Sequence, residues 1–288
     1  MNNIVSAWNI EIAVDSKWAE LTSLKVNWSE YLYQKIAWFW QRQSPILFPI
    51  VGKLRNDRFE HNGQEYEIPQ HGFLRDMEWE LLDTWNAHEL AFRVNSDDQT
   101  REKYPWDFAL EIRYIIEQTT LRVEYSVTNT GVEVLPFSLG GHPAFHIDGP
   151  ISDYTLEFES DDGIVHYDLL DQENKWLISW HTGALQLNNG VLRLSEVLFA
   201  LDALIFQNLR SKKFTLLRNE KKVFTFDRGN FPHFALWKQP NAPFLCFEPW
   251  QGFADSINAT GNIAEKPGMF WLKGGDTKSY DWSIEIPE

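Results

Sequence analysis

Five short phrases of the sequence carry ionisable side chains in apolar or turn-rich surroundings. A charged group is expensive to bury in such surroundings unless it is paired or functional. Histidine and carboxylic acid side chains, which occur in these phrases, are also the usual general acids and bases of enzymes. The phrases are FPIVGKLRNDRF (48–59), IPQHGFLRDMEW (68–79), GGHPAF (140–145), LFALDALIF (198–206) and FLCFEPWQGFAD (244–255), which contain Lys53, His71 with Arg75, His142, Asp202 and Glu248.

His142 and Glu248 are the strongest candidates for chemistry. His142 follows Gly140 and Gly141, and we interpret these glycines as room for a substrate close to the backbone. Glu248 follows four apolar residues, where a carboxylate is costly to bury unless it has a task. Taken singly, His71 is as typical of a turn, and Asp202 is as typical of a helix cap. Taken together, an acid–base pair with hydrogen-bonding His, Asp and Arg side chains predicts a site for sugar chemistry.

Several other chemistries have no signature in the chain. The sequence lacks the glycine-rich phosphate and dinucleotide loops, the HExxH and CxxC metal motifs, and the GxSxG nucleophile motif. A metal site would need ligands drawn from distant residues such as His146 and His71, so we expect neither a metal nor a cofactor.

Composition limits the partners and the compartment. The formal net charge is −15 and the isoelectric point is near 5.0, which disfavours nucleic acid and anionic membranes as partners. One cysteine, Cys246, cannot form an internal disulfide, the N-terminus lacks a signal-peptide pattern, and no apolar run reaches the roughly 18 residues of a membrane span. We therefore expect a cytoplasmic protein. Aromatic residues make 15% of the chain, a content that suits both an aromatic core and the C–H faces of sugars.

The elements that must position these residues show a period of two. Alternating runs separated by short polar turns predict antiparallel hairpins over 108–131 and 213–226, and further strands over 154–160 and 279–286. Only 192–204 has the pattern of a short helix, and no strand–helix–strand alternation occurs. The sequence therefore predicts a single all-β domain over 1–288, a sandwich of two large antiparallel sheets.

The ordered phrases FPIVGKL, PQHGFLRD, FSLGGHPAFHI, LDALIF and EPWQGFAD resemble the aldose 1-epimerase (galactose mutarotase) superfamily, and most closely its LacX-like bacterial branch. The resemblance spans almost the whole chain and implies the β-supersandwich fold of that superfamily. It also implies that His142 is the general acid and Glu248 the general base. His71 and Asp202 match the residues that bind substrate hydroxyls, and we expect Arg75, Lys53 and Trp250 at or near the same cleft.

The sequence leaves alternative substrates and functions open. The HGFLR phrase is also similar to hexose-6-phosphate epimerases, in which an arginine at the Arg75 position helps to hold phosphate, so the substrate is a free or a phosphorylated aldohexose. A non-catalytic sugar-binding protein and a glycoside hydrolase with Asp202 and Glu248 as paired carboxylates are further hypotheses. The sequence leaves open whether the protein is a monomer or a homodimer.

Overall fold

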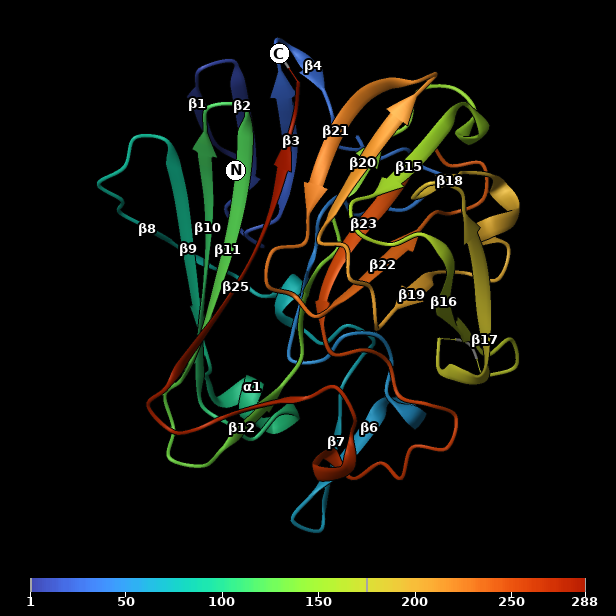
Figure 1. Cartoon of the computed structure of the whole chain (residues 1–288). Helices are drawn as coiled ribbons and strands as arrows, with labels where there is room; N and C mark the ends of the chain where they lie inside the picture. The colour runs from blue at the N-terminus through green and yellow to red at the C-terminus, as the bar shows by residue number, and fades with distance from the viewer. Residues whose placement is uncertain (1, 175, 288) are drawn as a thin grey trace.

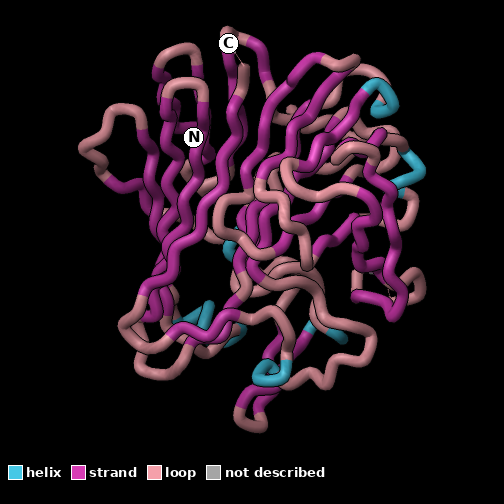
Figure 2. The backbone as a smooth tube through the Cα atoms, viewed as in Figure 1, coloured by secondary structure: helices cyan, strands magenta, loops and turns pink. Residues whose placement is uncertain are grey.

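The protein is an all-β molecule, as the sequence predicts. The computed structural model describes residues 2–174 and 176–287, and its strands run over most of the backbone trace (Figure 2). Strands hold 50% of the residues and helices 8%, far below the roughly one third of residues that are helical in an average globular protein. Within the described ranges no helix is long and apolar enough to cross a membrane.

Nine of the described strands form the larger of the two large antiparallel sheets (Figure 1). Its longest strands are β10 (Phe108–Glu117) and β11 (Thr120–Asn129), which form a hairpin and pair along their full length. In spatial order the strands are β18 (Val191–Arg193), β15 (Tyr154–Phe158), β20 (Lys213–Arg218), β21 (Lys221–Asp227), β25 (Thr277–Glu285), β11 (Thr120–Asn129), β10 (Phe108–Glu117), β9 (Glu89–Asn95) and β8 (Glu80–Leu82).

The second large sheet supplies the functional residues described below. It runs in the order β17 (Ile178–Leu187), β16 (Gly163–Leu170), β19 (Leu204–Phe206), β22 (His233–Trp237), β23 (Phe244–Gln251), β13 (Leu139–Gly141) and β5 (Ile46–Leu47), and β14 (Ala144–His146) also pairs with β23. All of these pairings are antiparallel.

Smaller elements complete the chain. The small strands are β1 (Asn2–Ala7), β2 (Ile10–Asp15), β3 (Leu21–Val26) and β4 (Ser29–Glu30) in one sheet, β6 (Arg58–His61) with β7 (Gln64–Glu67), and β12 (Leu135–Phe137) with β24 (Phe270–Leu272). The helical segments are α1 (Asp98–Lys103) and five 3-10 turns at Arg55–Asp57, Leu74–Asp76, Ile151–Asp153, Glu196–Phe199 and Ile263–Glu265.

The main hydrophobic core lies between the two large sheets. The ring of Phe224 on β21 lies 5.1 Å from that of Phe247 on β23, and the ring of Phe214 on β20 stacks at 4.0 Å on Phe234 of β22. Each of these contacts joins one sheet to the other, so the sheets pack face to face as in a β-sandwich. Burying aromatic rings in this layer fixes the second sheet against a rigid support.

The predicted strands are confirmed. In β10 the alternating residues from Phe108 to Ile116 are at most 1% exposed, and Tyr280, Trp282 and Ile284 of β25 are at most 2% exposed. The hairpin turns are one residue shorter than the polar segments suggest. Gln118 and the pair Asn219–Glu220 adopt positive φ in these turns, and the next strands begin at Thr120 and Lys221.

The predicted helix over 192–204 is wrong. The segment holds β18, a 3-10 turn at Glu196–Phe199 and the start of β19. Leu192 pairs with Leu156 of the neighbouring strand, so sheet pairing overrides the local apolar spacing. The same correction removes Asp202 as a helix cap, because its φ of 86° lies in the left-handed region. The helix that does form, α1, is short and polar and starts with a capping box at Asp97.

Candidate active site

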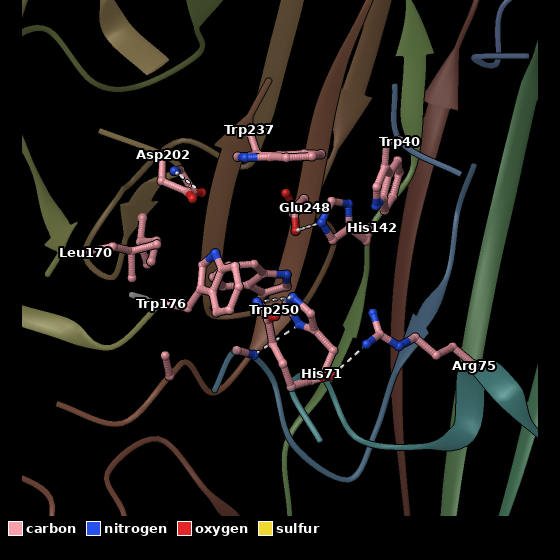
Figure 3. A pocket seen from close by; sticks show the side chains of 15 residues that line it. Trp40, His71, Arg75, His142, Leu170, Trp176, Asp202, Trp237, Glu248 and Trp250 are labelled. Atoms are coloured by element: carbon pink, nitrogen blue, oxygen red, sulfur yellow. Dashed lines mark hydrogen bonds and ion pairs between the residues drawn. The ribbon is translucent and has the colours of Figure 1, made fainter. Parts of the chain in front are cut away.

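One cavity of about 230 Å³ gathers most of the predicted site residues (Figure 3). It opens over the second sheet, where β19, β22 and β23 lie side by side. Six of the seven predicted residues, all except Lys53, line this cavity together with residues that the sequence did not single out. The lining residues are Trp40, Gly52, Gln70, His71, Arg75, His142, Leu170, Trp176, Asp202, Ala203, Ile205, Trp237, Glu248, Trp250 and Ala254.

Strand β23 directs Glu248 into the cavity. Side chains alternate between the two faces of a strand. Leu245 and Phe247 point into the main core, whereas Glu248 and Trp250 point to the opposite face and line the cavity. Both faces of β23 are covered by protein, so nearly all of its residues are apolar. Glu248 is the charged exception, and it is only 1% exposed.

The two glycines before His142 have a different task from the one that the sequence suggests. A Cβ on Gly140 would lie 2.6 Å from Cδ1 of Trp250, and one on Gly141 would lie 3.0 Å from the hydroxyl of Tyr125. Neither glycine lines the cavity within the described chain. The glycines therefore make room for protein side chains and not for a substrate. This packing fixes the strand that leads into His142.

His142 and Glu248 form a close buried pair. Nε2 of His142 lies 3.1 Å from Oε2 of Glu248, and the two side chains are 9% and 1% exposed. The approach is short but is not directed as a hydrogen bond, and neither Oε2 nor His142 Nδ1 has a hydrogen-bond partner among the described residues. A buried polar atom without a partner is rare in a folded protein. These atoms are thus available to a ligand.

Burial sets the protonation of the pair. Desolvation raises the pKa of Glu248 well above its usual value, and the nearby charge of Asp202 raises it further. Desolvation lowers the pKa of His142 to about 3. Each shift disfavours the charged form of its group. Burial therefore favours the neutral form of both groups, a protonated carboxyl group on Glu248 and a neutral imidazole on His142.

His71 presents a hydrogen-bond donor to the cavity. The backbone N–H of Gly52 donates to Nδ1 of the His71 ring at 3.1 Å, and the backbone N–H of His71 donates to the Gly52 carbonyl at 2.8 Å. An accepting Nδ1 carries no proton, so the neutral ring bears its hydrogen on Nε2. Burial, followed by the charges of His142 and Arg75, lowers the pKa of His71 well below its usual value. The fold therefore favours the neutral tautomer with its hydrogen on Nε2, which faces the cavity and lies 3.4 Å from the side-chain amide nitrogen of Gln70.

Asp202 lies on the opposite side of the cavity from His71 and is held by a strained turn (Figure 3). Its φ is 86°, and its Oδ1 accepts a hydrogen bond of 2.8 Å from the backbone N–H of Ala203. Non-glycine residues in the left-handed region cost free energy and cluster at functional sites. Burial raises the pKa of Asp202, while its backbone bond and the indoles of Trp176 and Trp237 oppose that rise.

Arg75 lines the cavity, whereas Lys53 stands outside it. The guanidinium of Arg75 donates a 2.7 Å hydrogen bond to the carbonyl of Gln70, and burial lowers the pKa of Arg75. The ammonium group of Lys53 lies 3.3 Å from Asp57 and 5.4 Å from the ring centre of Trp176. Lys53 is not among the described residues that line the cavity. It supports one wall through Trp176.

Sequence reasoning missed three tryptophans that shape the cavity. The ring of Trp40 lies 4.6 Å from that of His142, and Trp237 meets His142 edge to face at 5.6 Å. Trp176 stands beside Asp202 (Figure 3). The high tryptophan content is the only signal in the sequence that points to these residues, and it does not say which of the 14 tryptophans are involved.

Comparison with known proteins gives a consistent result over nearly the full chain. The family model described as aldose 1-epimerase matches residues 16–284. The chain is 33% identical to the plasmid-encoded protein LacX of Lactococcus lactis, over 92% of this chain and 93% of that one. A galactose mutarotase related enzyme from Lactobacillus acidophilus superimposes with a TM-score of 0.92 at 28% identity, covering 100% and 98% of the two chains. A galactose mutarotase-like protein from Lactobacillus casei gives 0.91 at 25% identity, with both chains fully covered.

Proposed function

The chain belongs to the aldose 1-epimerase family, and from that premise we propose that it interconverts the α and β anomers of a free aldohexose. The observation that carries the proposal is the buried pair of His142 and Glu248, 3.1 Å apart at the wall of a cavity. A protein that only binds sugar has no need of an acid and a base placed side by side at the wall of its cavity.

The reaction opens and closes the sugar ring. A base takes the proton of the C1 hydroxyl, an acid gives a proton to the ring oxygen, and the C1–C2 bond turns before the ring closes with the roles exchanged. Both oxygens are bonded to C1, so the acid and base must lie within a few ångströms of each other. Glu248 as base and His142 as acid meet this condition.

The single proton of the pair suits a reversible cycle. Ring opening starts with the proton on His142 and ends with a protonated Glu248 and a neutral imidazole. Burial favours this second arrangement, because it carries no charge. Ring closing then uses Glu248 as the acid and His142 as the base. No group other than these two side chains has to change its protonation.

The remaining side chains are suited to hold a sugar ring. We assign hydroxyl binding to the Nε2 donor of His71 and to the carboxylate of Asp202, and place Arg75 at the same wall. The indoles of Trp40, Trp176 and Trp237 provide flat apolar faces for C–H groups. Pockets for drug-sized ligands span roughly 300–1,000 Å³, and the smaller volume here, about 230 Å³, favours one sugar ring over an oligosaccharide.

Polarimetry with freshly dissolved sugars tests the function and its substrate class. We expect faster mutarotation of α-glucose or α-galactose than in buffer, and a lower kcat/KM for glucose 6-phosphate. Arg75 is the one Lys or Arg side chain among the described lining residues, and it is already bonded to the Gln70 carbonyl. A tenfold preference for the phosphorylated sugar would reverse the assignment, because it would show a phosphate site.

Failure of every sugar to mutarotate faster than in buffer would contradict the proposed activity. Binding of the same sugars without turnover would then favour the non-catalytic alternative. Release of sugar from an aryl glycoside would instead indicate that Asp202 and Glu248 act as the paired carboxylates of a hydrolase.

The pH profile of kcat/KM should be displaced from that of free side chains. Adding a second proton to the pair must charge His142, whose pKa is lowered to about 3. Activity should therefore persist below pH 6.5, the ordinary value of histidine. Removing the shared proton must ionise Glu248, whose raised pKa places the alkaline loss of activity well above the ordinary glutamate range. A rate that falls by half near pH 6.5 on acidification would contradict this assignment.

A further inference from the structure

A third potential ligand group lies beside the acid–base pair. The ligand atoms of His142, Cys246 and Glu248 all lie within 4.8 Å of one another, and all three residues are buried. Cys246 precedes Glu248 by two positions on β23, so both side chains point to the same face of the strand. β14, which follows His142 in the chain, pairs Ala144 with Cys246 and thereby holds the two segments together.

The donor set is that of a site for a soft or borderline divalent cation. A thiolate, an imidazole and a carboxylate are common zinc ligands, with Zn–S near about 2.3 Å and Zn–N near about 2.0 Å, which places tetrahedral ligand atoms roughly 3–4 Å apart. The 3.1 Å between His142 and Glu248 already fits this spacing. The sulfur of Cys246 lies within 4.8 Å of the other two ligand atoms, so a shift of about 1 Å brings it into this spacing.

One unpartnered atom points independently to a ligand at this place. Oε2 of Glu248, the atom that lies 3.1 Å from Nε2 of His142, is buried and lacks a hydrogen-bond partner in the described chain. Substrate accounts for contacts on the cavity side, but Cys246 does not line the cavity and has no part in ring opening. Cys246 is fully buried in a small apolar cluster with Tyr33, Ala144 and Phe244. The mechanism proposed above leaves this thiol unexplained.

We propose that His142, Cys246 and Glu248 bind one zinc-like divalent cation, and that the bound cation switches the enzyme off. On binding, the thiol proton and the shared proton of the pair leave to solvent, and sulfur, nitrogen and oxygen each give a lone pair to the metal. A coordinated thiol is deprotonated even where burial raises its ordinary pKa. With three protein ligands, the fourth position of a tetrahedral ion remains open to water.

Inhibition follows from the identity of the ligands. A metal-bound His142 cannot carry the proton for the ring oxygen, and a metal-bound Glu248 cannot accept that of the C1 hydroxyl. This part of the inference rests on the proposed function, whereas metal binding itself does not. The two are therefore tested by separate measurements.

The single cysteine makes the binding test specific. Cys246 is the only cysteine of the chain, so an ultraviolet thiolate-to-metal charge-transfer band that appears on titration with Cd²⁺ reports this site alone. We expect the band to saturate at one equivalent in the wild-type protein and to be absent in Cys246→Ser. Glu248→Gln and His142→Asn keep the thiol and should each weaken Cd²⁺ binding at least tenfold.

A matched control removes a histidine elsewhere. His88 packs against Trp8 and is not among the described residues that line the cavity, so His88→Asn should bind Cd²⁺ as the wild type does. No band in folded wild-type protein whose thiol is shown to be reduced would overturn the site. Unchanged affinity in both Glu248→Gln and His142→Asn would also overturn it, because the metal would then be held by the thiol without the pair. These two variants decide the matter even if Cys246→Ser does not fold.

Measuring mutarotation in the presence of Zn²⁺ tests whether the bound cation switches the enzyme off. We expect Zn²⁺ to inhibit the wild type, and its inhibition constant to rise at least tenfold in Cys246→Ser, with each protein referred to its own metal-free rate. Equal inhibition of both proteins would contradict the switch. If the wild type has no mutarotase activity, the proposed function fails while the Cd²⁺ titration still decides the metal site.

Discussion

Glu248→Gln should lower kcat by about 10²–10⁴-fold, the usual contribution of one general acid or base. Glutamine keeps the shape of the side chain but cannot accept the proton of the C1 hydroxyl. Because burial raises the pKa of Glu248 and favours a neutral carboxyl group, a neutral amide replaces it at little cost in stability. Polarimetric rates together with a thermal unfolding curve would measure the two effects separately.

The same experiment on His142 asks whether the pair acts as a unit. His142→Asn should lose a similar factor in kcat, and the double variant should be little slower than the slower single variant. Ring opening already stalls when either partner is missing, so the losses do not add. Trp40→Phe is a useful comparison, because it changes the ring that packs 4.6 Å from His142 while leaving both titrating groups in place.

Two results would contradict the catalytic roles that we assign to Glu248 and His142. Multiplicative losses in the double variant would show that the two side chains act in separate steps. A His142→Asn protein with a lowered melting temperature but near-normal turnover would make His142 a structural residue. Its position among Trp40, Trp237 and Glu248 gives a structural role a definite meaning, since the imidazole would then serve only to pack these side chains.

The sheet sandwich could be predicted because strand alternation is a local property. Residues Phe108 to Ile116 show which face is buried without reference to any partner strand, and the structure buries that face. The segment 192–204 shows the limit of local reasoning. Its leucines fit a helix, but pairing of Leu192 with Leu156 decides the outcome. Such a contact joins residues far apart in the sequence and leaves no periodic signal in either segment.

The residues of the candidate site also fall into two groups, those that the local sequence reveals and those that only the folded chain reveals. His142 and Glu248 could be singled out because each is an ionisable group in an apolar phrase. Trp40 could not, because it lies in an irregular loop, and only the folded chain brings its ring beside His142. The role of Gly140 is hidden from the sequence for a related reason. Its missing side chain leaves space for Trp250 on the paired strand β23, and the sequence of one strand does not show what its neighbour requires.

Gly72→Ala should lower the free energy of unfolding by about 3 kcal/mol or more. Gly72 has φ of 71°, and an added Cβ would lie 2.0 Å from the carbonyl oxygen of Phe48. The left-handed conformation alone costs a non-glycine residue roughly 1–2 kcal/mol, and the backbone contact must also be relieved. Phe48 is bonded to this loop through its N–H to the His71 carbonyl, at 3.3 Å. Relief of the clash should therefore move His71 and lower kcat/KM about tenfold.

Gly63→Ala is the matched control, since it separates the steric clash from the conformational cost. Gly63 has φ of 77° but no atom within 4 Å of an added Cβ, because it lies in the exposed turn between β6 and β7. This variant should lose only the roughly 1–2 kcal/mol of left-handed strain and keep its full kcat/KM. Urea unfolding and polarimetry on both proteins give the comparison. Equal losses of stability in the two variants would mean that the Phe48 carbonyl yields easily, and that the loop bearing His71 is not held in place by Gly72.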